Sequence, residues 1–190
     1  MPNPTKQFFR LLLLPALWFS CAGSFAQTPS LSLQQTVAAA GFIFSGKVLD
    51  VWSVREAATG FIVTYTTIAV QDGVRGVTGS RFTFKQYGGS YNGLNVFVAD
   101  MSYFAVGEEV VAFLYPVSAL GLTSPVGVAE GKWTMQRDPA TGKKFVAANA
   151  LAVKMPEPHA EAPAANAAPR MEYESFIKMI RELAARDRQP

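Results

Sequence analysis

The chain has 190 residues, with 17 lysines and arginines against 14 aspartates and glutamates, and 49% of its residues are hydrophobic. A chain of this length can bury enough apolar surface to form one domain without a covalent staple. Its net charge of +3 gives no reason to expect a nucleic-acid partner, because nucleic-acid binding rests on neutralising several phosphates.

Residues 1–26 have the three regions of a secretory signal peptide. Lys6 and Arg10 precede an apolar run at residues 11–19, and small residues end at Ala26. The apolar run is roughly half the ~20 residues that a bilayer span needs. We therefore predict export, with cleavage after Ala26 and a secreted or periplasmic mature chain.

Cleavage after residue 26 would leave 164 of the 190 residues, with 15 basic against 14 acidic side chains and a net charge of +1. The mature chain would then contain no disulfide, because Cys21 is the only cysteine. The alternative is a lipoprotein anchored through Cys21, but residues 18–20 lack the spacing that lipoprotein signals favour. We expect no stable membrane span in the mature chain.

Residues 28–40 are predicted to form a short helix that packs on the rest of the domain. Leu33 and Val37 recur at helical spacing. Ser30 or Ser32 can cap the N-terminus, because a serine side chain accepts a hydrogen bond from a free backbone N–H of the first turn.

A β-rich region follows, beginning with a long strand at residues 41–54. Its apolar alternation slips at residues 49–51, close to Gly46, which indicates a bulge. Phe82 and Phe84 give the clearest half-buried alternation in the chain. Further strands are predicted at residues 61–70, 81–86 and 109–115, a weaker strand at 120–128, and a hairpin at 133–146.

The C-terminal part divides into two segments of opposite character. Residues 155–169 are rich in alanine and proline, which is typical of a linker. In residues 170–190, Phe176, Ile177 and Ile180 recur at helical spacing, which predicts an amphipathic helix. We expect its apolar face to dock on the domain, or alternatively on a partner.

These elements predict an all-β fold with terminal helices. Several antiparallel strands in hairpin order, with a long first strand and a bulge, favour a small OB-like barrel over a parallel α/β sheet. We expect the barrel and the short N-terminal helix to lie in residues 27–154, followed by the linker and the C-terminal helix.

The chain resembles exported bacterial proteins whose OB-like barrel is similar to the TIMP and netrin-like (NTR) module. The resemblance covers roughly residues 37–146, and one departure is Ser102, at a position where that pattern has a proline. The residues that carry it are Phe44-Ser45-Gly46-Lys47-Val48, Val74-Arg75-Gly76, Gly88-Gly89 and the run from Phe104 to Leu114.

The TIMP likeness implies an inhibitor whose N-terminal cysteine binds the zinc ion of a protease. The mature chain would instead begin at Gln27 and contain no cysteine. The resemblance therefore supports the fold and gives no support to inhibition of zinc proteases.

The sequence offers no constellation for catalysis or metal binding. His159 is the only histidine and lies in the predicted linker, so neither a metal cluster nor a histidine-dependent triad is expected. Asp100, Glu108 and Glu109 are interpreted as solvated charges, since adjacent strand residues face opposite ways. We predict that the protein is not an enzyme and has no cofactor.

Two binding functions remain open. The first is an exported, non-catalytic module that acts as a protein-partner or inhibitor-like domain, and the alternative is binding of a carbohydrate or another cell-envelope ligand. For the alternative, Tyr87, Tyr91 and Tyr103 are the candidate ligand-binding residues, because aromatic rings stack on sugars and OB barrels bind oligosaccharides. Trp52 and Trp133 are further candidates for such a face.

Overall fold

The computed structural model describes residues 31–148 and 170–187. The predicted signal peptide at 1–26, the predicted linker at 155–169 and residues 188–190 lie outside the described residues. The helices are α1 (Leu33–Ala39) and α2 (Tyr173–Arg186), and the strands are β1 (Phe42–Arg55), β2 (Ile62–Arg75), β3 (Arg81–Tyr87), β4 (Gly89–Tyr91), β5 (Leu94–Val96), β6 (Glu109–Leu114), β7 (Lys132–Arg137), β8 (Lys144–Ala148) and β9 (Arg170–Glu172).

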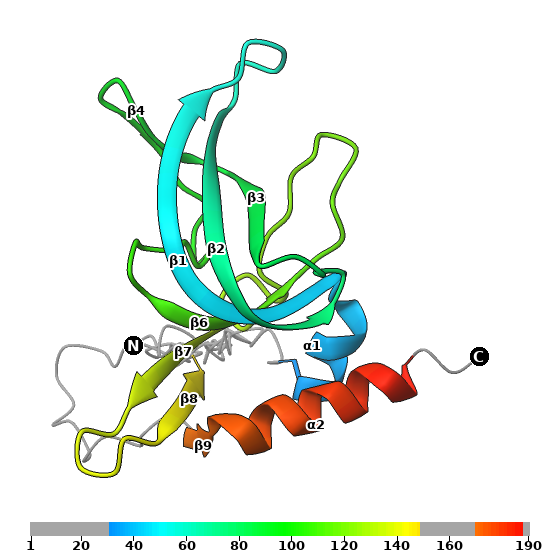
Figure 1. The fold of residues 1–190 in the computed structure, drawn as a ribbon. Coiled ribbons are helices and arrows are strands. Elements are labelled where there is room, and N and C mark those ends of the chain that lie inside the picture. Colours follow the sequence, from blue (N-terminus) through cyan, green and yellow to red (C-terminus); the bar gives the residue numbers. More distant parts are fainter. Residues whose placement is uncertain (1–30, 149–169, 188–190) are drawn as a thin grey trace, which may run out of the picture.

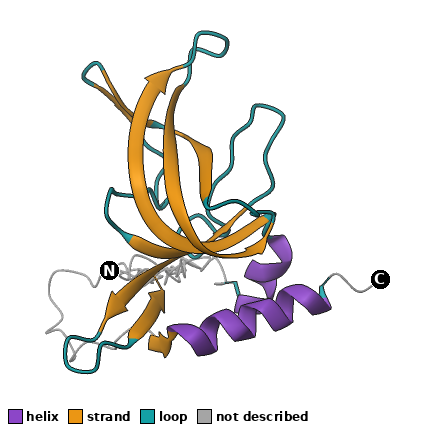
Figure 2. Ribbon diagram, in the orientation of Figure 1, coloured by secondary structure: helices purple, strands orange, loops and turns teal. Residues whose placement is uncertain are grey.

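The described chain is mostly β, as predicted, and its strands form one large antiparallel sheet and one hairpin. The large sheet has the order β3-β2-β1-β6-β7-β8-β9, and β4 pairs with β5. Figures 1 and 2 show β1 and β2 curving strongly above the two helices. Among the described strands no pairing joins β3 to β9, so the sheet is open and the predicted barrel is confirmed only as a curved antiparallel sheet.

The connection between β3 and β6 gives the sheet its topology. β1, β2 and β3 pair in sequence order, and β6 then returns beside β1. The spatial order β6-β1-β2-β3 is that of a Greek key. The long return includes the β4–β5 hairpin and comes back to the middle of β1, where Gly107 N–H donates to the Val48 carbonyl (2.9 Å).

The predicted bulge lies in β1. The register of β1 against β2 shifts between Val48 and Asp50, so that Leu49 is left without a partner. At Gly46, a Cβ atom would come within 2.2 Å of the Ala69 carbonyl oxygen. The strands approach closely here because glycine lacks that atom, and the bulge increases their curvature.

Two strand predictions from the sequence, at residues 120–128 and 61–70, were wrong or incomplete. Residues 120–128 form no strand, because Pro125 makes only a single bridge to Leu114 and the rest is turn and loop. β2 continues to Arg75, past the predicted end at residue 70, since Gly73 is paired with Phe44 within the sheet. The predicted hairpin at 133–146 is confirmed by β7 and β8, with Met135 opposite Val146.

The sheet is buried on both faces where β6 crosses it. Val111 and Phe113 belong to a core cluster shared with the helices, whereas Val110, Ala112 and Leu114 belong to a second cluster inside the curve of the sheet. Successive strand residues point to opposite faces. The uninterrupted apolar run of β6 is therefore explained by burial on both sides.

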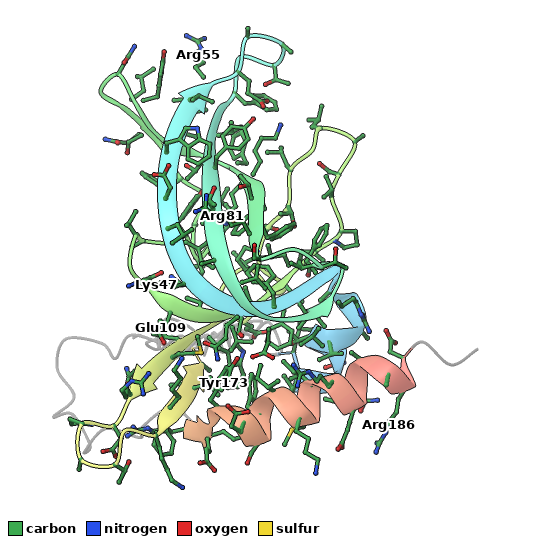
Figure 3. The ribbon with its side chains drawn as sticks, in the orientation of Figure 1. Lys47, Arg55, Arg81, Glu109, Tyr173 and Arg186 are labelled. Carbon is green, nitrogen blue, oxygen red and sulfur yellow. The ribbon has the colours of Figure 1, made fainter. Side chains whose placement is uncertain are left out.

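The C-terminal helix docks on the sheet, which is the arrangement expected for its apolar stripe. Phe176, Ile177 and Ile180 of α2 are almost completely buried. Tyr173, at the start of α2, has its hydroxyl 2.6 Å from that of Ser45 and donates to Asp72. Figure 3 shows Tyr173 directed from α2 toward the sheet.

A single arginine links the two helices to the sheet. Arg75 of β2 donates to the carbonyls of Val37 (2.8 Å) and Ala40 (3.0 Å) at the end of α1. The same guanidinium donates to the Ala184 carbonyl (3.3 Å) and pairs with Asp187 at the end of α2. Both helix C-termini thus obtain partners for carbonyls that have none within the helix. The predicted cap at Ser32 is confirmed by its 3.2 Å bond from Gln35 N–H.

Candidate binding groove

Exposed apolar side chains are concentrated in the part of the chain that runs from the end of β3 to the start of β7. Of the exposed large hydrophobic residues in the described ranges, most lie between residues 87 and 128, and the others are scattered. A concentration of this kind marks an interaction surface more often than single exposed residues do. The residues between 87 and 128 are Tyr87, Leu94, Phe97, Val98, Val106, Tyr115, Val117, Leu120 and Val128.

Several of these side chains line a cavity of about 450 Å³. We call it the loop groove. Its volume is in the range of small-ligand pockets. The lining comes from the end of β3, the 98–101 segment and the 115–128 segment: Tyr87, Val98, Met101, Tyr115, Pro116, Ser118, Leu122, Thr123, Ser124 and Val128.

One wall of the loop groove is a tight loop at residues 115–124. Tyr115 N–H donates to the Ser124 carbonyl (2.9 Å), and the Thr123 hydroxyl donates to the Tyr115 carbonyl (2.6 Å). Ser118 N–H donates to the Leu122 carbonyl (2.8 Å), and Ser118 Oγ accepts from Leu122 N–H (3.2 Å). Hydrogen bonds therefore join the two sides of the 115–124 loop both at its ends, between Tyr115 and residues 123 and 124, and near its tip, between Ser118 and Leu122.

Next to the loop groove, a buried lysine holds the 103–108 segment. Lys132 of β7 donates from Nζ to the Tyr103 carbonyl (2.7 Å) and pairs with Glu108 Oε2 (2.7 Å). Its ammonium also lies 5.0 Å from the centre of the Phe104 ring. A buried ammonium requires such partners, because an unpaired one would be costly to desolvate. The 103–108 segment is thereby fixed to the sheet.

Ser102 connects two of the segments that line the loop groove. Its N–H donates to the Val128 carbonyl (3.1 Å), and its own carbonyl accepts from Gln86 Nε2 (3.1 Å). A proline at position 102, as in the pattern that the sequence resembles, would have no N–H to donate. The serine therefore supports a contact that connects the 98–102 and 125–128 segments.

The backbone around the loop groove is strained. Val128 has a φ of 67° and Asp100 a φ of 61°, and the third positive φ among the described non-glycine residues, 48° at Asn92, lies in the same part of the chain. For a β-branched residue such as Val128 this conformation is unusual and costly. Strain of this kind persists where surrounding contacts enforce it, and it concentrates at functional sites.

The structure brings together two of the three predicted ligand-binding tyrosines. The Tyr103 hydroxyl donates to the Tyr87 carbonyl (2.8 Å) and accepts from Val98 N–H (3.2 Å). Burial raises the pKa of the Tyr103 phenol above its usual value, so the phenol remains a donor. Tyr87 lines the loop groove, whereas Tyr91 lies in β4 and is absent from that lining. A ligand-binding role for the three tyrosines stays a prediction.

The two tryptophans of the suggested sugar-stacking face lie elsewhere. Trp133 packs on Phe176 of α2, with ring centres 4.7 Å apart, and belongs to the helix-covered core. Trp52 stacks on Tyr65, with ring centres 5.2 Å apart and planes at 11°. The aromatic residues singled out in the sequence therefore do not form one face.

Within residues 31–148 and 170–187, no group of three or more histidine, cysteine, aspartate or glutamate side chains is placed to hold a metal ion. Those same residues contain no helix that is both long and apolar enough to cross a membrane. His159 lies outside the described residues.

Comparison with known proteins adds no assignment: no family model matches the chain, and neither the curated proteins nor the solved structures contain a match. Sequence reasoning missed most of the groove lining, including Met101, Tyr115, Leu122 and Val128. The available signal was compositional, since these apolar residues stand in segments rich in glycine, serine and proline, where solvated loops usually have few of them.

Proposed function

We propose that this protein is an exported, non-catalytic binding module and that the loop groove is its contact surface for a protein partner. The observation that carries the proposal is the concentration of exposed apolar side chains around one rigid groove. Water-exposed apolar area of this kind is stabilised when a partner covers it, at roughly 25 cal/mol per Å². Because hydrogen bonds already fix the segments around the loop groove, binding of a partner would require little further ordering of the chain.

The proposal includes an OB-like fold of the TIMP/NTR-like kind. An OB fold is a partly open Greek-key barrel of five strands. The order β6-β1-β2-β3, with β7 beside β6, and the bulge at Leu49 in a long β1 support this assignment. OB folds bind ligands through the face of their second and third strands and the loops that follow the first and fourth strands, and the 115–128 segment that lines the loop groove joins β6 to β7.

The alternative function, binding of a carbohydrate or another envelope ligand, is supported by a separate observation. Trp52 is 39% exposed and stacks on Tyr65, and exposed flat rings suit sugar faces. This pair lies outside the lining of the loop groove. A ligand that binds through Trp52 would thus leave variants of the loop groove unaffected.

The proposal is tested by a matched pair of variants in the native host. Val98 lines the loop groove at 40% exposure, and Met179 lies on the outer side of α2 at 38% exposure. We expect Val98→Asp to abolish recovery of a specific envelope protein with the tagged chain, and Met179→Asp to leave recovery unchanged. Equal recovery with both variants would contradict the proposal, and loss only with Trp52→Ala would favour the alternative.

A further inference from the structure

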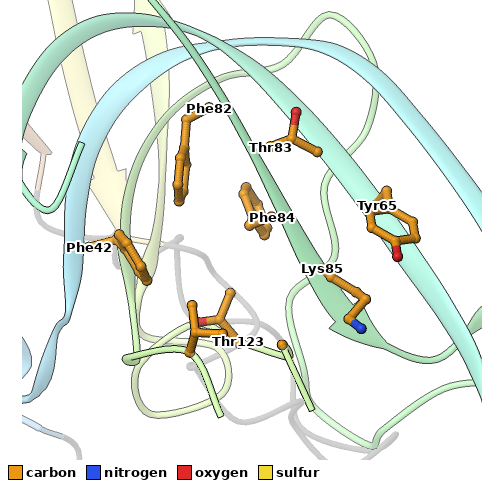
Figure 4. Close-up of a pocket in the computed structure, with 9 residues that line it drawn as sticks. Phe42, Tyr65, Phe82, Thr83, Phe84, Lys85 and Thr123 are labelled. Atoms are coloured by element: carbon orange, nitrogen blue, oxygen red, sulfur yellow. The ribbon is translucent and has the colours of Figure 1, made fainter. Parts of the chain in front are cut away.

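A second cavity, of about 290 Å³, lies along the edge strand β3. Figure 4 shows Phe82 and Phe84 on the opposite side of the β3 ribbon from Thr83. Side chains from both faces of β3, Phe82 and Phe84 on one and Thr83 and Lys85 on the other, line this cavity. A cavity lined from both faces of a strand must follow its edge. We call it the edge cavity.

The hydrogen bonds of β3 show which backbone groups point into this space. Gly88 N–H donates to the Ile62 carbonyl (2.8 Å), and the Ser80 carbonyl accepts from Val70 N–H (2.9 Å). The backbone N–H and C=O groups of the even-numbered residues of β3 therefore point toward β2. Those of the odd-numbered residues point away from β2, toward the open edge. In agreement, the outward carbonyl of Lys85 accepts from Thr123 N–H (2.8 Å).

Within the described chain, no residue accepts a hydrogen bond from the outward N–H of Thr83 or donates one to its outward C=O. The loop at residues 115–124 thus covers the edge at Lys85 and leaves it open from Thr83 toward Arg81. An open edge of this kind is a template for pairing with another extended chain.

The edge cavity also offers a place for an apolar side chain. The Phe42 and Phe82 rings are 5.1 Å apart, and the Phe82 and Phe84 rings are 5.9 Å apart. Val117, on the opposite wall, is 52% exposed. An extended peptide on the edge would direct every second side chain toward these rings.

We propose that the open edge of β3 binds an extended, acidic segment of a partner protein as an added strand. Thr83 supplies the main-chain hydrogen bonds, and the three phenylalanine rings accept one apolar side chain. Arg81, which is exposed and forms no ion pair among the described residues, attracts an acidic side chain of the segment. The inference rests on the proposed binding function and specifies the kind of partner.

Charge argues against a second copy of this chain as the occupant. Two β3 strands that paired antiparallel about Thr83 would place Arg81 of each copy opposite Lys85 of the other. Like charges directly opposite are destabilising.

The test uses a synthetic probe, the acetylated and amidated peptide Glu-Val-Thr-Val-Glu. Two matched probes are the same peptide with its central amide N-methylated and the charge-reversed peptide Lys-Val-Thr-Val-Lys. Binding to the mature chain is followed by NMR titration and by hydrogen exchange of the Thr83 amide. We expect the acidic peptide to slow exchange at Thr83 and the methylated peptide to bind up to about tenfold more weakly.

Two variants of Thr83 separate the backbone from the side chain. Thr83→Pro removes an outward backbone N–H, a change that edge strands tolerate. It also removes the hydrogen bond between the Thr83 and Thr67 hydroxyls. Thr83→Val loses the same hydroxyl bond and keeps the N–H. We expect the proline variant to lose the acidic peptide and the valine variant to bind it. Should the proline variant fail to fold, Arg81→Glu replaces it, and it should then prefer the charge-reversed peptide.

The outcomes distinguish this inference from the proposed function. Absence of acidic-peptide binding at millimolar concentration, or equal binding by the proline and valine variants, would overturn the inference. Shift changes confined to the loop groove would also overturn it. In each of these cases the loss of partner recovery with Val98→Asp would still support the proposed function.

Discussion

Apolar side chains differ in exposure between the helix-covered face of the sheet and the loop groove. On the face covered by α2, Phe113 and Phe176 are fully buried, with ring centres 6.3 Å apart and edge to face. In the loop groove, Tyr115 and Val128 remain more than a third exposed. Both regions are rich in apolar residues, but in the described chain an element covers only the first of them.

Their polar contacts differ in the same sense. On the helix-covered face, Tyr173 and Arg75 attach α2 to the sheet. Around the loop groove, Lys132 and Ser102 hold the neighbouring loops in place. We infer that the first set of contacts stabilises the fold, and that the second keeps a binding surface in shape before the partner arrives.

Removing the helix should break this comparison most severely. A chain ending before Pro156 loses α2, whose Phe176, Ile177 and Ile180 each contribute about 1.5–3 kcal/mol through burial. With Tyr173 added, the loss is comparable to the whole stability of a small domain, about 5–15 kcal/mol. We expect the truncated chain to be unfolded or to bind a hydrophobic dye. An unchanged unfolding midpoint would contradict a structural role for α2.

A single substitution should show the same difference at smaller scale. Phe113→Ala is expected to reduce the free energy of unfolding by about 3–5 kcal/mol, because the side chain is fully buried. Phe61→Ala, at a residue with 39% exposure, should cost less than about 1 kcal/mol. Denaturant unfolding measures both, and similar losses would show that the two positions are equally part of the core.

The Tyr173 hydroxyl is expected to contribute less. Tyr173→Phe leaves Ser45 and Asp72 without that partner and should cost about 1–3 kcal/mol at neutral pH. Tyr91→Phe is the matched control, since its hydroxyl has no hydrogen bond to the described residues. It should be neutral in the same unfolding assay. A neutral Tyr173→Phe would mean that the docked helix depends on apolar packing alone.

The same variant has an alkaline signature. Burial, and secondarily the hydrogen bond to Asp72, raise the pKa of the Tyr173 phenol. An unfolded tyrosine loses its proton near pH 10, so above that pH the unfolded chain binds fewer protons and stability falls. The wild type should lose more stability between pH 9 and pH 11 than Tyr173→Phe. Parallel losses would show that Tyr173 does not titrate differently in the two states.

The smallest effect concerns the strained groove backbone. Val128→Gly should raise the free energy of unfolding by about 0.5–1 kcal/mol, because glycine adopts a φ of 67° without steric cost. Val117→Gly, at a residue absent from the positive-φ set, should lower it by about the same amount. If the groove is the binding surface, Val128→Gly should also weaken partner recovery. A destabilised Val128→Gly would show that its side-chain contacts outweigh the strain.

Local patterns were sufficient to predict several elements of the fold. The stripe of Phe176, Ile177 and Ile180 predicted α2, the slip near residue 49 predicted the bulge, and Ser32 was one of two predicted caps. Each of these signals depends on residues close in sequence. Gly73, by contrast, lies beyond the predicted end of the second strand at residue 70, although its pairing with Phe44 keeps it within β2.

The groove could not be predicted in the same way. Its shape depends on contacts between distant residues, such as that of Lys132 with Tyr103, which are 29 positions apart. Residues 120–128 looked like an interrupted strand because Pro125 stands among alternating apolar residues. In the structure those residues instead form loops whose apolar side chains stay partly exposed. Tyr87, Tyr91 and Tyr103 were candidate ligand-binding residues in the sequence. Which of them lie close together depends on how the chain returns from β3 to β6.

The central claim is that the protein partner contacts the loop groove and not the outer side of α2. It is tested most directly by placing a photoreactive benzoylphenylalanine at Tyr115, which is 36% exposed in the loop groove, or at Met179, which is 38% exposed on α2. Both variants are expressed and irradiated in the native host, and the adducts are identified by mass spectrometry. The account predicts a specific protein adduct from position 115 and none from position 179. An adduct from position 179 alone would contradict it.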